Sequence, residues 1–143
     1  MLRYLALFSS LLFVMTTDLI CLLILSLWSI PLNHMPALGR ASEAGLEWAA
    51  SNREKAVKGP VWVGRADRAQ RNHHDNLAMI AAVMLIAQVT GQANGITAIA
   101  AMAILGCRVL HGVAYIAGIT LVRSLAYFGS IIGVGVIAWQ VFI

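Results

Sequence analysis

Four long apolar runs alternate with polar connections along the chain. They cover roughly residues 17–39, 76–92, 96–118 and 124–143. A helix needs about 20 mostly apolar residues to cross a bilayer, so each run predicts one transmembrane helix. The pattern therefore predicts an all-α integral membrane protein, with a single four-helix domain over residues 1–143.

The connections between these runs differ in length and composition. Polar residues 65–76 contain neither Pro nor Gly, so they are expected to extend the second helix into water. Gly91, Asn94 and Gly95 predict a tight turn before the third helix. About five residues lead from the third helix to the fourth, which predicts that these two helices are antiparallel neighbours.

The first 14 residues allow two interpretations. Residues 2–14 are mostly apolar, with Arg3 near the front, which resembles the core of a signal peptide. No small-x-small cleavage site follows, and Met15-Thr-Thr-Asp18 looks like a second protein start. We therefore expect residues 1–14 to prolong the first span or to come from an upstream start, rather than to be cleaved.

Composition supports a membrane protein and excludes other classes. Of 143 residues, 60% are apolar and 11% are charged, and the mean hydropathy is +0.82. Soluble domains are about 45–50% apolar and about 25% charged, so an ordinary soluble domain and a disordered chain are both excluded. Seven of the ten basic residues lie between Arg40 and Arg71, so no nucleic-acid partner is expected. Cys21 and Cys107 lie in apolar runs and provide no disulfide framework.

The basic residues also predict an orientation. Lys and Arg in short loops favour the cytoplasmic side of a membrane. The loop at residues 40–64 carries several, whereas residues 88–95 carry none. We therefore expect the 40–64 loop and Arg123 to face the cytoplasm and both termini to face away. The protein would be a multi-pass protein, of the inner membrane if it is bacterial.

Three polar side chains interrupt the third apolar run. Arg108, His111 and Tyr115 are spaced at i, i+3 and i+7, so they fall within about 60° of one another on one helix face. An ionisable group near the centre of a span costs at least about 2.5–3.5 kcal/mol, which makes these residues candidates for function. The alternative is a buried polar seam that holds helices together.

A second polar cluster precedes the second apolar run. Arg71 and Asp75 are four residues apart on one side of a predicted helix, with Asn72 beside them. Taken alone, this pattern is explained by a solvated helix end whose long side chains reach the interface.

A third cluster opens the fourth span with Arg123, Ser124 and Tyr127. Arginine at a helix N-terminus opposes the helix dipole, so an anionic ligand or a partner carboxylate would explain Arg123; a positive-inside anchor is the alternative. The three clusters meet at the predicted cytoplasmic ends of the spans, which suits a small polyanionic ligand with an ammonium group. No metal is expected, because the adjacent His73 and His74 point about 100° apart and no second chelating pair follows.

Together, the three clusters resemble the MAPEG family, the membrane-associated proteins in eicosanoid and glutathione metabolism. The pattern is Arg68-Ala-Gln-Arg71-Asn72-x-x-Asp75, then Arg108-x-x-His111-x-Val-Ala-Tyr115, then Arg123-Ser124-x-x-Tyr127. The family includes microsomal glutathione transferases and prostaglandin E synthase. The resemblance covers roughly residues 17–140, and Asp75 stands where the family usually has Glu.

The resemblance implies four transmembrane helices, a homotrimer, and glutathione bound as a cosubstrate between neighbouring subunits near the cytoplasmic side. Arg123, with Ser124, matches the position that steadies the thiolate. The positions that match glutathione contacts are Arg40, Arg71, Asn72, Asp75, Arg108, His111, Tyr115 and Tyr127.

Two functions follow from the resemblance. The first is a glutathione-dependent transferase or peroxidase that acts on lipophilic electrophiles dissolved in the bilayer. The second is a non-catalytic protein that binds membrane lipids or presents them to another enzyme. The presence of Arg123, Ser124 and Tyr127 favours catalysis. A small channel or transporter is disfavoured, because no polar stripe runs through a whole span.

Overall fold

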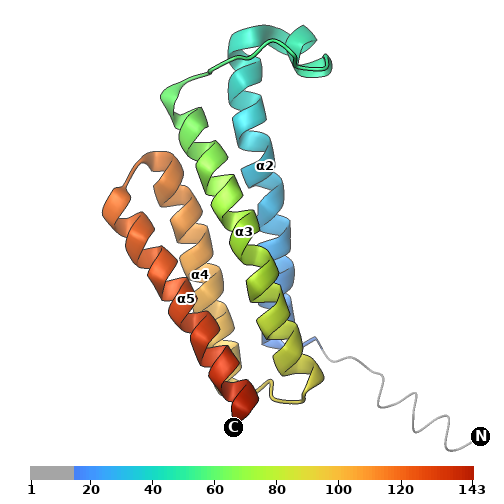
Figure 1. The fold of residues 1–143 in the computed structure, drawn as a ribbon, viewed down its shortest axis with the longest axis vertical. Helices are drawn as coiled ribbons and strands as arrows, with labels where there is room; N and C mark the ends of the chain where they lie inside the picture. The colour runs from blue at the N-terminus through green and yellow to red at the C-terminus, as the bar shows by residue number, and fades with distance from the viewer. Residues whose placement is uncertain (1–14) are drawn as a thin grey trace, which may run out of the picture.

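A computed structural model describes residues 15–143 and contains four α-helices there (Figure 1). The interpretation of residues 1–14 lies outside the described residues. The helices are α2 (Thr17–Ala50), α3 (Val61–Val89), α4 (Gly95–Ala117) and α5 (Thr120–Phe142). The prediction of an all-helical chain with four helices is confirmed.

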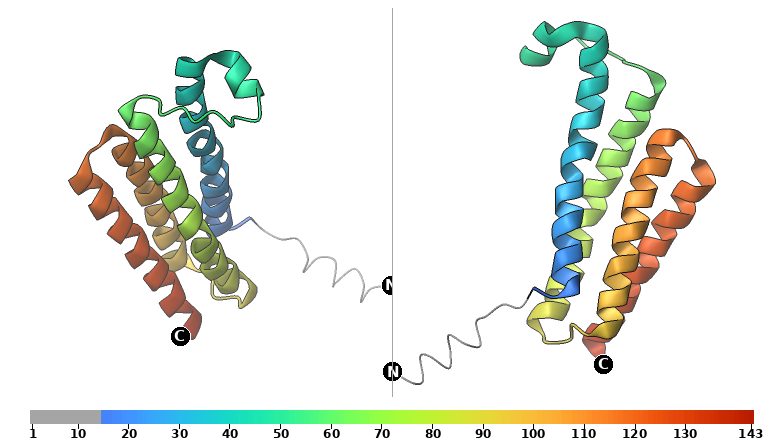
Figure 2. Two further views of the ribbon diagram at one scale, coloured as in Figure 1. Left: turned by 45° about the horizontal axis from the view of Figure 1, so that its top comes forward. Right: turned by 180° about the vertical axis from the view of Figure 1, so that it is seen from behind.

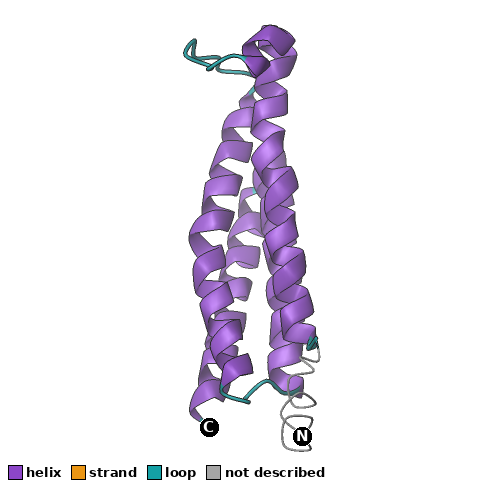
Figure 3. Cartoon of the chain, turned by 90° about the vertical axis from the view of Figure 1, so that its right-hand side faces the viewer, coloured by secondary structure: helices purple, strands orange, loops and turns teal. Residues whose placement is uncertain are grey.

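The four helices run alternately up and down in one bundle. Helix α3 contacts the other three, α4 packs on α5 and α2, and α2 and α5 do not touch within the described part. The 51–60 loop and the α4–α5 turn lie at one end of the bundle, which we call the basic end. The start of α2 and the α3–α4 turn lie at the other end, which we call the opposite end (Figures 1 and 2). Helices α2 and α3 extend beyond α4 and α5 at the basic end. The α2–α3 loop protrudes from the bundle there (Figure 3).

Helix α2 is longer than the apolar run that predicted it. Residues 40–50, which were expected to begin the cytoplasmic loop, are helical, and the connection to α3 spans only residues 51–60. The Ala- and Glu-rich sequence favours a helix despite its charge. A kink divides this end of the helix at Gly45, whose φ of 83° is accessible to glycine without strain.

Local signals determine where the later helices begin and end. Asn94 caps α4, its side chain accepting from the Thr97 backbone N–H while the Thr97 hydroxyl accepts from the Asn94 N–H. Gly118 ends α4 in the left-handed conformation, with φ 84°, and α5 starts two residues later. Within the described residues, α2, α4 and α5 are long and apolar enough to cross a membrane; α3, whose first half is polar, does not meet that description.

The apolar core lies in the half of the bundle nearer the opposite end. Gly133 of α5 allows a close helix approach, because a Cβ there would lie 2.6 Å from Cγ1 of Ile104 on α4. The fully buried side chains of this core include Leu25, Ile80, Met84, Ala101, Ile104 and Ile137. The polar clusters lie above this core, toward the basic end.

Candidate functional site

A polar hollow of about 230 Å³ lies near the basic end, where α3, α4 and α5 meet. Six of its seven lining residues were predicted site residues, and they come from all three polar clusters. The lining consists of Asn72 from α3, His111 and Tyr115 from α4, and Arg123, Ser124, Tyr127 and Phe128 from α5. The fold thus brings together groups that lie up to 56 residues apart in the sequence (from 72 to 128).

His111 links α4 to the start of α5. Its Nδ1 lies 2.9 Å from the backbone oxygen of Arg123. Because a carbonyl only accepts, Nδ1 carries the proton, and in the neutral ring Nε2 then has a free lone pair. Nε2 is buried and makes no hydrogen bond within residues 15–143. The imidazole therefore keeps a buried acceptor without a donor among the described residues, in a side chain that lines the hollow.

Arg123 is stacked against an aromatic ring. Its guanidinium lies 4.6 Å from the ring centre of Tyr115, a distance at which a cation is attracted to the face of the ring. The His111 ring lies 5.5 Å from that of Tyr115 and 5.9 Å from that of Tyr127. No carboxylate pairs with Arg123 in the part of the chain that the structure describes. The hollow therefore contains a positioned cation that no carboxylate of the described residues neutralises.

Arg108 supports the hollow from behind and does not line it. The side chain is 1% exposed. It donates from Nη1 to Oδ1 of Asn72 at 3.1 Å and from Nη2 to the Asn72 backbone oxygen at 2.9 Å. Arg108 thereby fixes the rotamer of Asn72, whose amide reaches the hollow. Its contact with a ligand, implied by the resemblance, would pass through Asn72.

Three other predicted site residues do not line the hollow of a single chain. Arg71 and Asp75 are exposed on a side of α3 that turns away from it, together with His74. They form no ion pair with each other within the described residues. Arg40 pairs with Asp67 across α2 and α3.

Two residues near the site were not among the predicted site residues, although Arg68 belongs to the pattern that resembles the family. Arg68 lies one turn before Asn72, and its guanidinium is 6.0 Å from the Tyr115 ring centre, so that ring interacts with two arginines. The i, i+4 spacing of Arg68 and Asn72 could have identified it. Phe128 lines the hollow, but an apolar residue in an apolar span gives no such signal.

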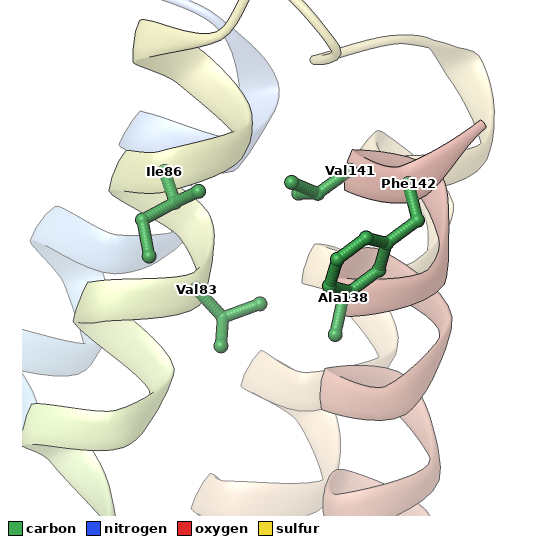
Figure 4. Close-up of a pocket in the computed structure, with 5 residues that line it drawn as sticks. All are labelled: Val83, Ile86, Ala138, Val141 and Phe142. Carbon is green, nitrogen blue, oxygen red and sulfur yellow. The ribbon is translucent and has the colours of Figure 1, made fainter.

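An apolar hollow of about 220 Å³ lies between α3 and α5 nearer the opposite end (Figure 4). Val83 and Ile86 of α3 line it. Around the helix axis, both lie within about 40° of Asn72 on the same helix. On α5, Ala138 and Phe142 also line it. Both lie within about 40° of the direction of Ser124. The polar hollow and the apolar one therefore lie on the same sides of these two helices.

Comparison with known proteins agrees with this arrangement. The model of the MAPEG family matches residues 18–143, nearly the whole chain. Searches of curated proteins and of solved structures give no match to the chain. With a membrane-type four-helix bundle, polar clusters that converge in it and a match over residues 18–143, the chain belongs to the MAPEG family.

Proposed function

We propose that this protein is a glutathione-dependent transferase or peroxidase that acts on lipophilic electrophiles. The observation that carries the proposal is the Arg123 guanidinium in the hollow, held by the Tyr115 ring beside Ser124 and paired with no carboxylate of residues 15–143. A fixed cation there favours a ligand whose reacting group is an anion. Glutathione provides such a group in its thiolate.

The chemistry follows from thiol ionisation. The thiolate is the nucleophile, and a free thiol has a pKa of about 8.5. A guanidinium in a partly water-excluded site stabilises the anion and so increases the thiolate fraction. The thiolate then attacks an electrophilic carbon, and an S–C bond forms as the leaving group departs with its electron pair. In the peroxidase reaction the thiolate attacks one oxygen of a hydroperoxide, so that an S–O bond forms, the O–O bond breaks and the alkoxide leaves, taking a proton to become the alcohol. A second glutathione thiol then attacks the sulfenic acid, which gives the disulfide and water.

The lipophilic substrate would reach the sulfur along α3 and α5. The apolar hollow lined by Val83 and Phe142 lies on the same side of these helices as the polar one (Figure 4). An alkyl chain in that hollow would place a reactive group toward Ser124 and Tyr127. The aliphatic lining gives no selectivity for one electrophile over another.

We further propose that the functional form is a homotrimer with the site between subunits. Asn72 is bonded to Arg108, which lies nine residues before the end of α4 at Ala117, or about 14 Å along the helix. Arg71 and Asp75 are therefore exposed at a depth inside the bundle, where contact with lipid is costly. A second copy of the chain would cover them and bring them to the ligand that Arg123 holds.

The orientation is a separate proposal: the basic end faces the cytoplasm. Ser51 lies in the loop at the basic end, and Gln92 lies in the α3–α4 turn at the opposite end. A cysteine introduced at Ser51 should react with a membrane-impermeant reagent only from the cytoplasmic side, and one at Gln92 only from the other side. The reverse labelling pattern would contradict this orientation.

Equilibrium binding of glutathione to the detergent-purified protein tests the function. Arg71→Ala and Asp75→Ala should each weaken binding about 10- to 100-fold, because each removes a charge-assisted hydrogen bond worth roughly 1.5–3 kcal/mol. Arg53→Ala removes the same charge from the exposed 51–60 loop and should leave the affinity unchanged. Native mass measurement of the same sample should give three chains; a stable, active monomer would contradict the intersubunit site.

The second candidate function is lipid binding without catalysis. The apolar hollow between α3 and α5 favours it, because that hollow suits an acyl chain whether or not a thiol is present. The wild-type protein would then bind lipid and show no binding of glutathione. That result would replace the first proposal by the second.

A further inference from the structure

A buried carboxylate lies at the opposite end of the bundle, far from the polar hollow. Asp18, in the first turn of α2, is only 2% exposed. Its Oδ1 makes no hydrogen bond within the described residues. Asp18 lines a separate hollow of about 340 Å³, together with Thr16, Thr17, Asn94 and Gly95. A buried carboxylate is costly unless it is paired, so this position requires an explanation.

Helix capping does not explain Asp18, although two helices start beside it. The Leu19 N–H at the start of α2 donates to the Thr16 hydroxyl. At the start of α4, the Asn94 side chain accepts from the N–H groups of Ile96 and Thr97. These capping roles are therefore filled by residues other than Asp18.

No positive side chain of residues 15–143 neutralises Asp18 either. The Arg and Lys residues at positions 40–71 lie in α2, α3 and their connection on the way to the basic end, and Arg108 and Arg123 belong to the polar cluster around Asn72. The ion pair that the structure contains in the described part joins Arg40 to Asp67. Among residues 15–143, the carboxylate is thus an acceptor without a donor, beside open space.

We propose that this hollow binds a primary ammonium group, with Asp18 as its counter-ion. An ammonium group carries three N–H donors and a positive charge, and Asp18 offers it an oxygen with no other partner among the described residues, in a hollow that Thr16 and Thr17 also line. Within the described residues, no three His, Cys, Asp or Glu side chains gather as a metal site would require. The place at the end of the membrane-crossing helices suits the amine of a lipid headgroup, and a free alkylammonium ion has the same chemistry.

Binding to the full-length protein in detergent tests the proposal. The probes are phosphatidylethanolamine, phosphatidylcholine, phosphatidylglycerol and free ethanolamine. Phosphatidylethanolamine should bind, whereas phosphatidylcholine, whose nitrogen has no N–H, and anionic phosphatidylglycerol should not bind at this hollow. Competition by free ethanolamine would identify a soluble amine as the ligand, and its failure to compete would identify the lipid; each outcome supports an ammonium site.

Three variants connect the binding to Asp18. Asp18→Asn should weaken binding about 10- to 100-fold, the loss expected for one charge-assisted hydrogen bond. Gly95→Leu should abolish binding by filling the hollow while leaving Asp18 in place, since a Cβ at Gly95 meets open space. Glu47→Gln makes the same charge change at an exposed position near the basic end and should have no effect.

Equal affinity of the wild-type protein and Asp18→Asn for phosphatidylethanolamine would overturn the proposal, as would the absence of binding to the wild-type protein. Should Asp18→Asn fail to fold, Gly95→Leu still decides the question, because it keeps the carboxylate. The result is independent of glutathione binding, since none of these residues lines the polar hollow.

Discussion

The two halves of the bundle are built from the same four helices but bury different kinds of side chain. In the half near the opposite end, Leu25, Ile104 and Ile137 are fully buried, and glycines allow the helices to pack closely. Toward the basic end, Arg108 and His111 are also buried, yet each has a nitrogen with no hydrogen-bond partner among the described residues. The half near the opposite end is filled by apolar side chains apart from Asp18 and Thr97 at its edge, whereas the half toward the basic end buries a cluster of polar side chains. The close-packed apolar core and the polar hollow are therefore separated along the bundle axis.

The largest expected effect comes from substituting Arg123, which should change turnover without changing the apolar core. Arg123 lines the polar hollow and contacts no part of that core. We expect Arg123→Leu to lower glutathione-dependent turnover about 10²- to 10³-fold, the loss typical of a group that stabilises an anionic reacting centre. Glutathione affinity should fall much less, because the guanidinium interacts most strongly with the charged sulfur. Steady-state kinetics with a lipophilic electrophile would measure this difference. Equal losses in affinity and turnover would show that Arg123 only binds.

Asn72 should affect both the hollow and its support. In Asn72→Ala, Arg108 loses the acceptor for Nη1 and keeps only its bond to the backbone oxygen. We expect a loss of about 1–3 kcal/mol in the free energy of unfolding, because a buried charged donor is left without a partner. Asn72→Asp retains an acceptor of similar shape and is the matched control. Denaturant titration in detergent would measure both variants; full stability of Asn72→Ala would show that Arg108 does not depend on this contact.

A substitution in the apolar half should lower the free energy of unfolding without changing glutathione affinity. In Gly133→Ala the new Cβ would lie 2.6 Å from Ile104 Cγ1 and 3.3 Å from the Ala100 backbone oxygen. We expect a loss of roughly 1–3 kcal/mol from overpacking, with glutathione affinity unchanged. Gly135→Ala, two residues away, meets open space and should be neutral or slightly stabilising. Comparable stabilities of the two variants would contradict the account of close α4–α5 packing.

The smallest expected effect comes from substituting His111, with variants that replace one or the other of its two ring nitrogens. His111→Asn keeps a donor near the position of Nδ1, and so the bond to the Arg123 backbone oxygen, but removes the Nε2 acceptor. We expect unchanged stability and a loss of affinity of about fivefold, equivalent to roughly 1 kcal/mol. His111→Gln places its amide nearer Nε2 and should instead lose stability. Thermal unfolding and glutathione titration of the two variants would check this; the opposite order would assign the ligand contact to Nδ1.

The sequence could predict features that depend on composition and periodicity. Apolar runs located the four helices, and the i, i+3, i+7 spacing placed His111 and Tyr115 on the side of α4 that lines the hollow. The helical continuation over residues 40–50 was missed, because its charge is equally typical of a loop. The depth of a side chain was not predictable from spacing: Arg108 shares that side of α4 but ends behind Asn72. Whether Arg71 and Asp75 face a ligand depends on a neighbouring chain, and no periodicity within one chain contains that information.

The proposed function depends on Arg123, which would hold glutathione as its thiolate in the polar hollow. Ultraviolet difference absorbance of the detergent-purified protein, with and without glutathione, tests it most directly, because the thiolate absorbs where the thiol does not. We expect the wild-type protein to show a thiolate signal near neutral pH, well below the free thiol pKa of about 8.5, and Arg123→Leu to lose that signal while still binding glutathione. An equal thiolate signal in the wild-type protein and in Arg123→Leu would show that Arg123 does not stabilise the thiolate.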